Sequence, residues 1–314
     1  EIIFDGRSFV TDKQGMVILE GKSFKEDLIE YNSRKEYDHL LIQKEEREEK
    51  EEDILHAIKL GLKDYFYKNK QQKITIALSG GIDSALVLTL AKLTFEKELV
   101  NDPTFIEAIY MPSKFSSNES RELSIELCAN LKIPLLHLPI KMLHSLYQQT
   151  FSDTSSPLTP LANENIQARI RGTLLYSLSN NKGSLVINTS NKSELAVGYS
   201  TQYGDSVGGI SLLGDLYKTE VYDLARYLNR KYNNLIPPAI INRAPSAELR
   251  EDQKDEDSLP PYEILDKILD SILNYQQSDK ELIESGLPRD IVKKVSRLVS
   301  ISEYKRYQFC PILK

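Results

Sequence analysis

A short polar loop that follows an apolar stretch of the chain combines the residue types that bind phosphate. After the apolar residues 74–78 the chain reads Ser79-Gly80-Gly81-Ile82-Asp83-Ser84. The glycines let backbone N–H groups approach an anion closely, and a helix that begins here points its positive N-terminus at that anion. The serines add hydroxyl donors, and Asp83 is placed to hold a divalent cation. The pattern predicts a phosphate-binding loop, although a plain strand–turn–helix corner would also use glycine.

The loop suits a pyrophosphate better than a transferable γ-phosphate, because no lysine occupies the Walker position and GxxxxGK[ST] is absent from the sequence. Its SGGxDS form resembles the signature of the N-type ATP pyrophosphatases. The resemblance implies that ATP adenylates a carbonyl or carboxylate oxygen, that pyrophosphate leaves, and that a nitrogen or sulfur nucleophile then displaces AMP. The loop alone does not choose among GMP synthetase, asparagine synthetase, tRNA-modifying enzymes and NAD synthetase.

Further segments of the sequence distinguish among these members of the N-type ATP pyrophosphatases. Residues 187–205 read INTSNKSELAVGYSTQYGD, residues 214–218 read GDLYK, and residues 164–172 read ENIQARIRG. Together with the loop APSAELREDQKDEDSLPPY at 244–262, they resemble the NAD synthetase family, in the same order over residues 74–309. The resemblance implies a ligase that amidates deamido-NAD to NAD through an adenylated carboxylate and releases AMP and pyrophosphate.

Oxygen ligands for Mg²⁺ are expected where two strands end. Asp83 and Glu194 lie far apart in the sequence, yet both follow predicted strands, so a parallel sheet can bring them to one edge. The family resemblance implies that they share the ion, which prefers one or two carboxylates plus phosphate oxygens. Thr189, beside the same strand end, would contact metal or phosphate. An alternative for Glu194 is a helix N-terminal carboxylate that accepts from free backbone N–H groups.

The helix expected at 163–180 offers polar groups to a dinucleotide. Asn165 and Arg169 share a helical face, which Arg171 shares only in part. Guanidinium groups bind phosphate in bidentate geometry. The resemblance implies that deamido-NAD binds here, with Tyr176 stacking or hydrogen-bonding nearby. A surface helix with i,i+4 pairs, and a tyrosine of the core, are the alternatives.

Three more residues complete the predicted site. The resemblance implies that Lys218 contacts an ATP phosphate, where a fixed ammonium group neutralises the negative charge that develops during attack. It also implies that Asp205 lies near the nicotinate and ammonia end, and that Ser246 reaches the phosphates from a mobile covering loop. Lys218 and Asp205 would otherwise be surface residues. The segment 111–120 follows the second predicted strand and is expected to line the adenosine pocket.

Alternating apolar strands and helical stretches must position these residues. Strands are predicted at 74–78, 105–111, 135–140 and 184–190. Helices are predicted at about 84–97, 119–131, 163–180 and 217–230. The alternation predicts the α/β class, with a parallel sheet covered by helices on both faces. The resemblance makes this sheet Rossmann-like, of the adenine-nucleotide alpha hydrolase type, in which ligands bind at the carboxyl ends of the strands.

The regions outside this body have their own patterns. Residues 1–36 read as short strands and turns and resemble the last strands of a nitrilase-like glutaminase domain, so we expect a remnant of that domain. Residues 37–72 are expected to be a linker built on one helix, 43–67. Residues 73–314 are predicted to form the synthetase domain. Within it a long polar loop and a helical tail are expected, at 244–261 and 262–309.

The composition is that of an ordinary globular protein. The 314 residues include 40% hydrophobic and 27% charged side chains, enough apolar sequence to bury a sizeable core. The net charge of −6 argues against a nucleic-acid substrate such as tRNA. No apolar run is long enough to predict a membrane span. The two cysteines, Cys128 and Cys310, build no disulfide framework, which favours a reducing, cytoplasmic compartment.

The sequence therefore predicts an amide-forming ligase that uses ATP and Mg²⁺ and acts on deamido-NAD. In the glutamine-dependent form of the family, a nitrilase-like domain makes ammonia with a nucleophilic cysteine, and neither cysteine here is a credible nucleophile of that kind. The chain is thus expected to be the synthetase part of the glutamine-dependent form, with ammonia either free or supplied by glutamine hydrolysis in the glutaminase domain of the full-length enzyme. Because members are commonly homodimers, the resemblance also implies a homo-oligomer. The alternatives are another N-type ATP pyrophosphatase with a different acceptor, and a nucleotide-binding subunit without catalysis.

Overall fold

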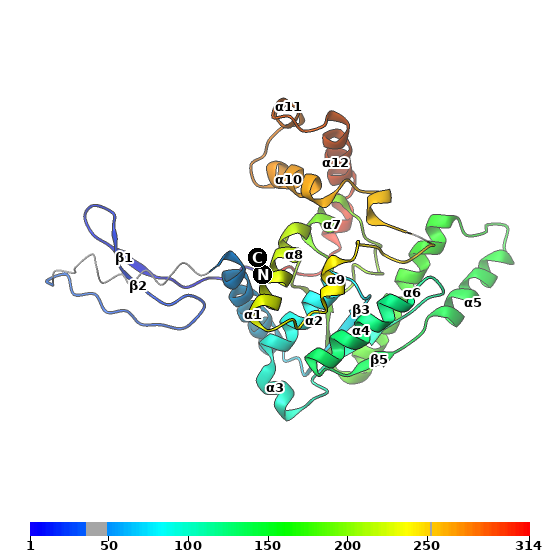
Figure 1. Cartoon of the computed structure of the whole chain (residues 1–314), viewed down its shortest axis with the longest axis horizontal. Coiled ribbons are helices and arrows are strands. Elements are labelled where there is room, and N and C mark those ends of the chain that lie inside the picture. Colours follow the sequence, from blue (N-terminus) through cyan, green and yellow to red (C-terminus); the bar gives the residue numbers. More distant parts are fainter. Residues whose placement is uncertain (36–48, 252) are drawn as a thin grey trace.

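The computed structural model describes residues 1–35, 49–251 and 253–314, and its main body is built on a five-stranded parallel sheet (Figure 1). The strands are β3 (Lys73–Leu78), β4 (Ile106–Tyr110), β5 (Leu135–His137), β6 (Ser184–Asn188) and β7 (Ile210–Ser211). Their order in the sheet is β5-β4-β3-β6-β7. The chain therefore moves outward from β3 and returns to its other side at β6. Sheets of this kind leave a crevice where the order reverses.

Apolar residues alternate between the two faces of the sheet and pack against different helices. On one face Ile74 and Ile76 of β3 join a cluster with α1, α2, α4 and α8. On the other face Ile109 of β4 and Val186 of β6 pack against α6. These helices are α1 (Lys50–Lys68), α2 (Ile82–Thr94), α4 (Asn118–Leu131), α6 (Pro160–Lys182) and α8 (Lys218–Lys231). The predicted α/β class, with helices on both faces, is confirmed.

Several elements differ from the sequence-based expectation. The helix expected at 84–97 is two helices, α2 and α3 (Glu96–Asn101), because the backbone leaves helical geometry at Phe95. Short elements were not predicted, since they span too few residues to show a periodicity: β7, α7 (Lys192–Val197) and α9 (Pro238–Asn242). The helix α5 (Lys141–Ser152) was also missed, and its Met142 and Leu146 are largely exposed. Of the expected helix 43–67, residues 43–48 lie outside the described residues.

Residues 1–35 start beside the C-terminus at the edge of the body and then form an arm that projects away from it (Figure 1, blue). It carries the antiparallel hairpin β1 (Phe9–Thr11) and β2 (Val17–Glu20), as the spacing of its glycines predicts. Asp12 closes the turn by accepting hydrogen bonds from two backbone N–H groups. The domain boundaries proposed above, 1–36, 37–72 and 73–314, stay predictions.

The predicted helical tail is present and forms a layer of its own at the top of Figure 1. Its helices are α10 (Tyr262–Leu273), α11 (Asp279–Glu284), α12 (Arg289–Ile301) and α13 (Glu303–Tyr307). Their apolar side chains pack together and against Ala196 and Val197 of α7 and Tyr217, the residue that precedes α8. The tail therefore rests on the part of the body that carries the predicted catalytic residues.

The ends of the chain extend the sheet beyond β7. Ser211 of β7 exchanges backbone hydrogen bonds with the C-terminal segment, and Ile3 donates to Lys314 at 2.7 Å. The sequence did not predict this pairing, because segments of three or four residues carry no strand pattern. In the described part of the chain, no helix is long and apolar enough to cross a bilayer.

Candidate active site

The carboxyl ends of β3, β4 and β6 open into a cavity of about 250 Å³. It lies where the strand order reverses, as expected for a sheet of this kind. The polar loop that follows α9 forms another part of its wall. Ten of the residues predicted from the sequence line it: Ser79, Gly81, Asp83, Ser84, Arg171, Thr189, Glu194, Asp205, Lys218 and Ser246.

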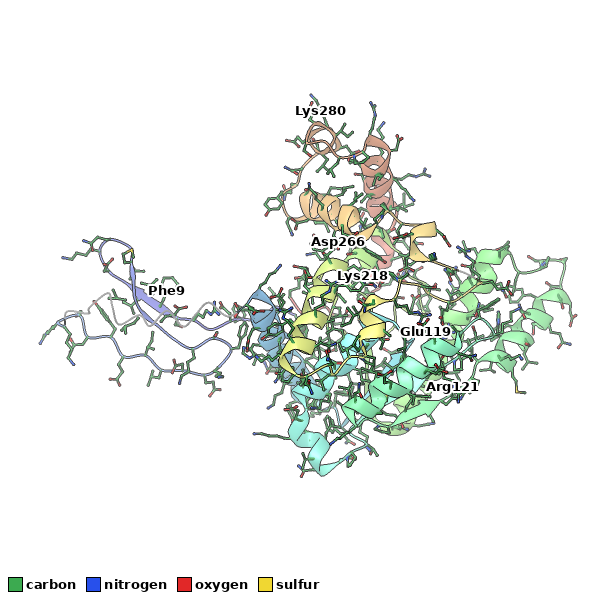
Figure 2. The ribbon with its side chains drawn as sticks, viewed as in Figure 1. Phe9, Glu119, Arg121, Lys218, Asp266 and Lys280 are labelled. Carbon is green, nitrogen blue, oxygen red and sulfur yellow. The ribbon has the colours of Figure 1, made fainter. Side chains whose placement is uncertain are left out.

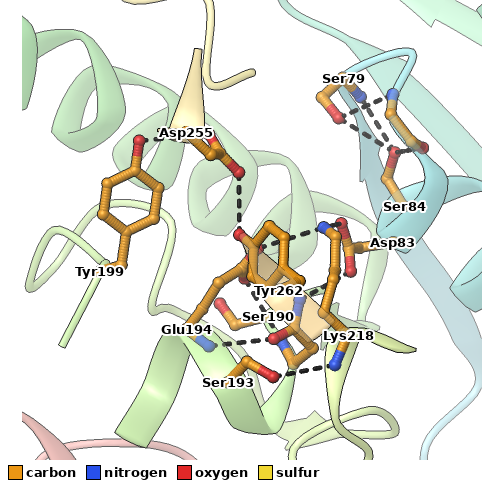
Figure 3. Close-up of polar contacts among 12 residues, drawn as sticks. Ser79, Asp83, Ser84, Ser190, Ser193, Glu194, Tyr199, Lys218, Asp255 and Tyr262 are labelled. Atoms are coloured by element: carbon orange, nitrogen blue, oxygen red, sulfur yellow. Dashed lines mark hydrogen bonds and ion pairs between the residues drawn. The ribbon is translucent and has the colours of Figure 1, made fainter. Parts of the chain in front are cut away.

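The loop between β3 and α2 is held together by its own serines. The hydroxyl oxygens of Ser79 and Ser84 lie 3.2 Å apart, and Ser79 Oγ accepts from the N–H of Gly81 at 3.2 Å (Figure 3). Gly80 has a φ of +79°, which glycine adopts without strain. A β-carbon at this position would lie 2.7 Å from the backbone of Ser120 in α4. The loop therefore needs glycine both for its turn and for the close approach of α4.

Lys218 lies at the centre of the cluster of charges beside this loop. Its ammonium group contacts Asp83 Oδ2 at 2.5 Å and Glu194 Oε1 at 3.5 Å (Figure 3). Its side chain is only 2% exposed, and those of Asp83 and Glu194 are 18% and 16% exposed. The sheet thus brings together two carboxylates from distant strand ends, as the sequence predicted, and it places the predicted lysine between them.

The two carboxylates and the lysine shift one another's ionisation. Burial alone would lower the pKa of Lys218, but the carboxylates of Asp83 and Glu194 outweigh it and raise that pKa above its usual range. Burial and the Asp83 carboxylate raise the pKa of Glu194, and Lys218 opposes that rise. Asp83 and Glu194 share one ammonium group, so the cluster can bind a further cation.

Asn191 fixes both acids in place. Its amide nitrogen donates to Asp83 Oδ1 at 2.9 Å, and its oxygen accepts from the N–H of Glu194 at 3.0 Å. Glu194 Oε2 in turn accepts from the N–H of Asn191 at 3.4 Å, which completes a capping box at the start of α7. The two interpretations of Glu194 are therefore compatible, because one oxygen caps the helix while the other faces Lys218.

The donor set fits Mg²⁺ bound together with phosphate. Among the residues that the structure describes, no three Asp, Glu, His or Cys side chains come together as a complete metal site. Asp83 and Glu194 would hold the ion together with phosphate oxygens, the arrangement that Mg²⁺ prefers. Both carboxylates already contact one positive charge, the ammonium group of Lys218. This shared contact supports their assignment as cation ligands.

Asp205 occupies a different part of the cavity wall. It is exposed to the cavity, and its carboxylate accepts from the N–H of Thr201 at 2.6 Å. Burial raises the pKa of Asp205 to about 6, opposed by the Thr201 N–H and by the positive charges of Lys305 and Arg171. Because the cavity admits water, solvent reduces the effect of burial on this pKa. Asp205 is therefore ionised at neutral pH but holds a proton in mildly acidic solution.

The raised pKa predicts a pH-dependent effect of Asp205→Asn. The folded state binds this proton more tightly than the unfolded chain, so the residue's stabilising contribution is present below about pH 4 and is lost as pH rises through about 6. We expect the variant to match or fall below the parent protein at about pH 5 and to unfold roughly 1–3 °C higher than it at about pH 7.5. Calorimetry at both values measures the difference. A Tm difference that is the same at both pH values would contradict the assignment.

Two predicted residues of α6 contact the turn that carries Asp205. Asn165 Oδ1 accepts from the hydroxyl of Thr201 at 2.9 Å, and Arg169 Nε donates to the carbonyl of Gln202 at 3.2 Å. Neither is among the described residues that line the cavity. Gly80, which is buried, is also not among them. Contact of Asn165 and Arg169 with a dinucleotide stays a prediction.

The other two predicted residues of α6 have different surroundings. Arg171 lines the cavity, and its Nε donates to the carbonyl of Met111 at 2.9 Å. Burial lowers its pKa to about 10, so it remains charged at neutral pH. Tyr176 is 38% exposed and lies beside the backbone of Gly208, away from the described cavity wall. The helix thus presents Arg171 to the cavity and Tyr176 to another surface.

Some residues of the cavity wall escaped the sequence analysis. Asp255 is a buried third acid that accepts from the hydroxyl groups of Tyr199 at 3.2 Å and Tyr262 at 2.9 Å (Figure 3). Tyr199 lies 56 positions earlier and Tyr262 seven positions later, and no sequence pattern links either hydroxyl to this acid. Asn191 had a recognisable signal, because an asparagine three residues before a glutamate is the signature of a capping box.

The loop after α9 is attached to the start of α4 by hydrogen bonds to Glu248, a residue that the sequence analysis also missed. Glu248 Oε1 accepts from the hydroxyl groups of Ser117 and Ser120, each at 2.8 Å, and pairs with Arg243 at 2.6 Å. Burial would raise the pKa of Glu248, but these hydrogen bonds hold it below its usual value. Ser246 therefore faces the cavity from a loop that Glu248 anchors to α4.

Comparison with known proteins agrees with this site. The model of the family described as NAD synthase matches residues 54–309. The glutamine-dependent NAD(+) synthetase of Aquifex aeolicus is 40% identical, over 98% of this chain and 59% of that relative. A solved structure of glutamine-dependent NAD+ synthetase from Acinetobacter baumannii in complex with ADP is 34% identical, with a TM-score of 0.64, over 97% of this chain and 55% of the other.

A shorter solved structure matches almost end to end. The NH3-dependent NAD synthetase from Campylobacter jejuni is 28% identical, with a TM-score of 0.66, over 82% of this chain and 96% of that one. By contrast, this chain spans little more than half the length of the glutamine-dependent relatives. The family model covers most of the sequence and all ten predicted residues of the cavity wall. The chain belongs to the NAD synthase family.

Proposed function

We propose that this chain catalyses the ATP-dependent amidation of deamido-NAD to NAD, through an adenylated nicotinate carboxylate, with release of AMP and pyrophosphate. The observation that carries the proposal is the contact of Lys218 with both Asp83 and Glu194 beside the SGGIDS loop. One ammonium group, two carboxylates and a glycine-rich loop before a helix form a site for a polyphosphate and its divalent cation.

In the first step a carboxylate oxygen of nicotinate would attack the α-phosphorus of ATP. The bond from that phosphorus to the bridging oxygen breaks, and pyrophosphate leaves with the electron pair. The loop's backbone N–H groups and Lys218 would hold the departing phosphates, and bound Mg²⁺ would neutralise part of their charge. Carboxylate and triphosphate repel each other, so orientation and charge neutralisation supply most of the rate enhancement.

In the second step ammonia would attack the carbonyl carbon of the adenylate. The carbon–oxygen bond to AMP breaks, and the nitrogen loses one proton. Asp205 faces the cavity, is ionised at neutral pH and lies within the electrostatic influence of Arg171. We assign Asp205 to the end where nicotinate and ammonia meet, and Arg171 to the dinucleotide. No side chain needs to form a covalent intermediate.

The source of ammonia follows from the relatives' names. The Aquifex aeolicus relative is called glutamine-dependent, and the Campylobacter jejuni structure is called NH3-dependent. The described chain contains a synthetase site, so we propose that ammonium alone supports its reaction. Glutamine would serve only where a glutaminase domain is joined to it.

Two wider features belong to the proposal. Met142, Leu146 and Leu161 on α5 and α6 are 81%, 58% and 66% exposed, a concentration of apolar side chains that supports a homo-oligomer. Cys128 and Cys310 are free thiols, as a reducing cytoplasmic setting predicts.

The test is an assay of pyrophosphate and AMP with ATP, Mg²⁺ and deamido-NAD, with either ammonium or glutamine. We expect both products with ammonium and neither with glutamine. Turnover only with another acceptor would favour a different N-type ATP pyrophosphatase. ATP binding without any pyrophosphate release would favour a nucleotide-binding subunit. Either of these results overturns the proposal.

A further inference from the structure

The two helices that carry Lys218 and Glu194 begin side by side and share one serine. Ser193 precedes Glu194 in α7, and its hydroxyl oxygen accepts from the backbone N–H of Lys218 at 2.9 Å (Figure 3). The same hydroxyl donates to Asp266 Oδ1 at 2.5 Å. Asp266 Oδ2 accepts from the N–H of Thr219 at 2.9 Å. One carboxylate therefore contacts both helices next to their catalytic side chains.

Asp266 comes from α10, outside the residues that line the cavity. It is 5% exposed, and its partners are a hydroxyl group and a backbone N–H rather than an ammonium or guanidinium group. A buried carboxylate is costly unless hydrogen bonds and local dipoles compensate it. Here the N-terminus of α8 supplies the positive end of a helix dipole. Figure 2 shows Asp266 and Lys218 close together between the helical layer and the body.

The start of α8 depends on this distant residue. Tyr217 stands at the N-cap position, and it makes no capping hydrogen bond from its side chain. Helices leave their first N–H groups without an internal partner, and a Ser, Thr, Asp or Asn at the N-cap ordinarily accepts from one of them. Asp266, 47 positions further along the chain, does this for Thr219.

The apolar packing around Asp266 holds the layers together without fixing their register. Leu265 and Leu269 of α10 pack in the same cluster as Val197 and Tyr217. Apolar contacts are non-directional, so they permit small sliding motions of one helix over another. Hydrogen bonds are directional, and the Asp266 carboxylate accepts two of them, from Ser193 of α7 and from Thr219 of α8. They fix α7 and α8 relative to each other.

We infer that Asp266 is a positioning residue for the proposed reaction: by bridging Ser193 and Thr219 it sets Lys218 and Glu194 in register with the phosphate-binding loop. The inference rests on the proposed function and adds a residue that touches neither substrate nor metal. It also gives the helical layer a role, because α10 contacts the starts of α7 and α8 through Asp266, beside the ring of Tyr262 that lies 5.3 Å from the Lys218 ammonium group.

The variant Asp266→Asn tests the bridge with little change in size. The N–H of Thr219 can only donate, so the amide oxygen of the new side chain must face it. The amide NH₂ then faces Ser193, whose hydroxyl loses its acceptor. We expect kcat for pyrophosphate release to fall roughly 10- to 100-fold, because small misplacements of catalytic groups are this costly. The KM for ATP should rise as well, but less than in a variant that lacks the Lys218 ammonium group, since that group is displaced rather than removed and the polyphosphate loop itself is untouched.

A matched control comes from the same helical layer. Asp279 Oδ1 accepts from the hydroxyl of Ser296, which ties α11 to α12 far from the cavity wall. Asp279→Asn weakens a comparable serine–aspartate bond by removing the charge of its acceptor, and we expect it to lower Tm while leaving kcat unchanged. If both variants lose stability alike and both keep the parent kcat, Asp266 is merely structural and the inference is wrong.

A double variant distinguishes the bridge from independent effects. Ser193→Ala removes both the contact with Asp266 and the acceptor of the Lys218 N–H, so once Ser193→Ala is present, adding Asp266→Asn should lower kcat no further than about twofold. Multiplied losses would overturn the bridge. A crystal structure of Asp266→Asn gives a readout without turnover, and Lys218 Nζ should have left hydrogen-bond distance of Asp83. If the parent protein is inactive the proposed function fails, whereas an unmoved Lys218 overturns the positioning role itself.

Discussion

Replacing Lys218 with methionine is expected to lower pyrophosphate release by roughly 100- to 1,000-fold, the loss seen when one fixed charge-stabilising group is removed from a site. Methionine keeps the length and apolar stem of lysine but removes the ammonium group. Asp83 and Glu194 then repel each other and the incoming triphosphate. The KM for ATP should rise together with the fall in kcat, because the ammonium group would contact the phosphates both before and during the attack.

The same substitution should also reduce stability at neutral pH. Lys218 is 2% exposed, and breaking a buried ion pair by removing one partner costs about 3–5 kcal/mol. The difference from the parent protein should shrink in acid, where the stranded carboxylates become protonated. Calorimetry and the pyrophosphate assay measure the two effects separately.

Lys231→Met is the matched control. Lys231 lies at the other end of the same helix and pairs with Glu52 outside the cavity wall. It should leave pyrophosphate release within about twofold of the parent and change stability by less than about 1 kcal/mol, as surface pairs do. Full activity of Lys218→Met would show that the ammonium group is not part of the reaction.

Gly80→Ala is the second change with a large expected effect. The backbone at Gly80 has a φ of +79°, and an added β-carbon would lie 2.7 Å from the backbone of Ser120. The left-handed conformation costs about 1–2 kcal/mol for a residue other than glycine. Displacing α4 or the loop adds about 1–3 kcal/mol. We expect a destabilised protein whose KM for ATP rises at least about tenfold, because the backbone N–H groups no longer converge on the phosphates.

Gly15→Ala separates the cost of the left-handed backbone conformation from the cost of the steric clash with α4. Gly15 has a φ of +81° in the hairpin turn, and a β-carbon there would meet nothing within 4 Å. This variant should show the conformational cost alone, with ATP use unchanged. Measurement of urea unfolding and of KM for ATP compares the pair. Parent-like ATP kinetics in Gly80→Ala would mean that the loop does not bind the phosphates.

The sequence predicted those parts of the fold and site that depend on local patterns. The apolar run before Ser79 and the glycines after it indicate a strand, a turn and a helix start, and the structure has each of them. The apolar residues of 184–190 likewise predicted the strand that ends at Asn188. Because parallel strands end at one edge, the topology allowed Asp83 and Glu194 to meet, and the family resemblance implied that they do.

The rest depends on contacts between distant residues. Arg169 and Arg171 are two positions apart on one helix, and only the packing of α6 decides that Arg171 faces the cavity while Arg169 braces the turn beside it. Asp255 and Asp266 are acids in polar or amphipathic segments that look like surface residues. Both are buried because hydroxyl groups from elsewhere in the chain surround them.

The proposed reaction requires that a nicotinate carboxylate oxygen bonds to the α-phosphorus of ATP and leaves with AMP. Deamido-NAD that carries ¹⁸O in both oxygens of this carboxylate tests it directly, in a reaction with ATP, Mg²⁺ and ammonium analysed by mass spectrometry. Attack on the α-phosphorus predicts that each molecule of AMP carries one labelled oxygen and that the pyrophosphate carries none. Unlabelled AMP, or label in pyrophosphate or inorganic phosphate, would contradict the account, because the carboxylate would then have attacked another phosphorus or none.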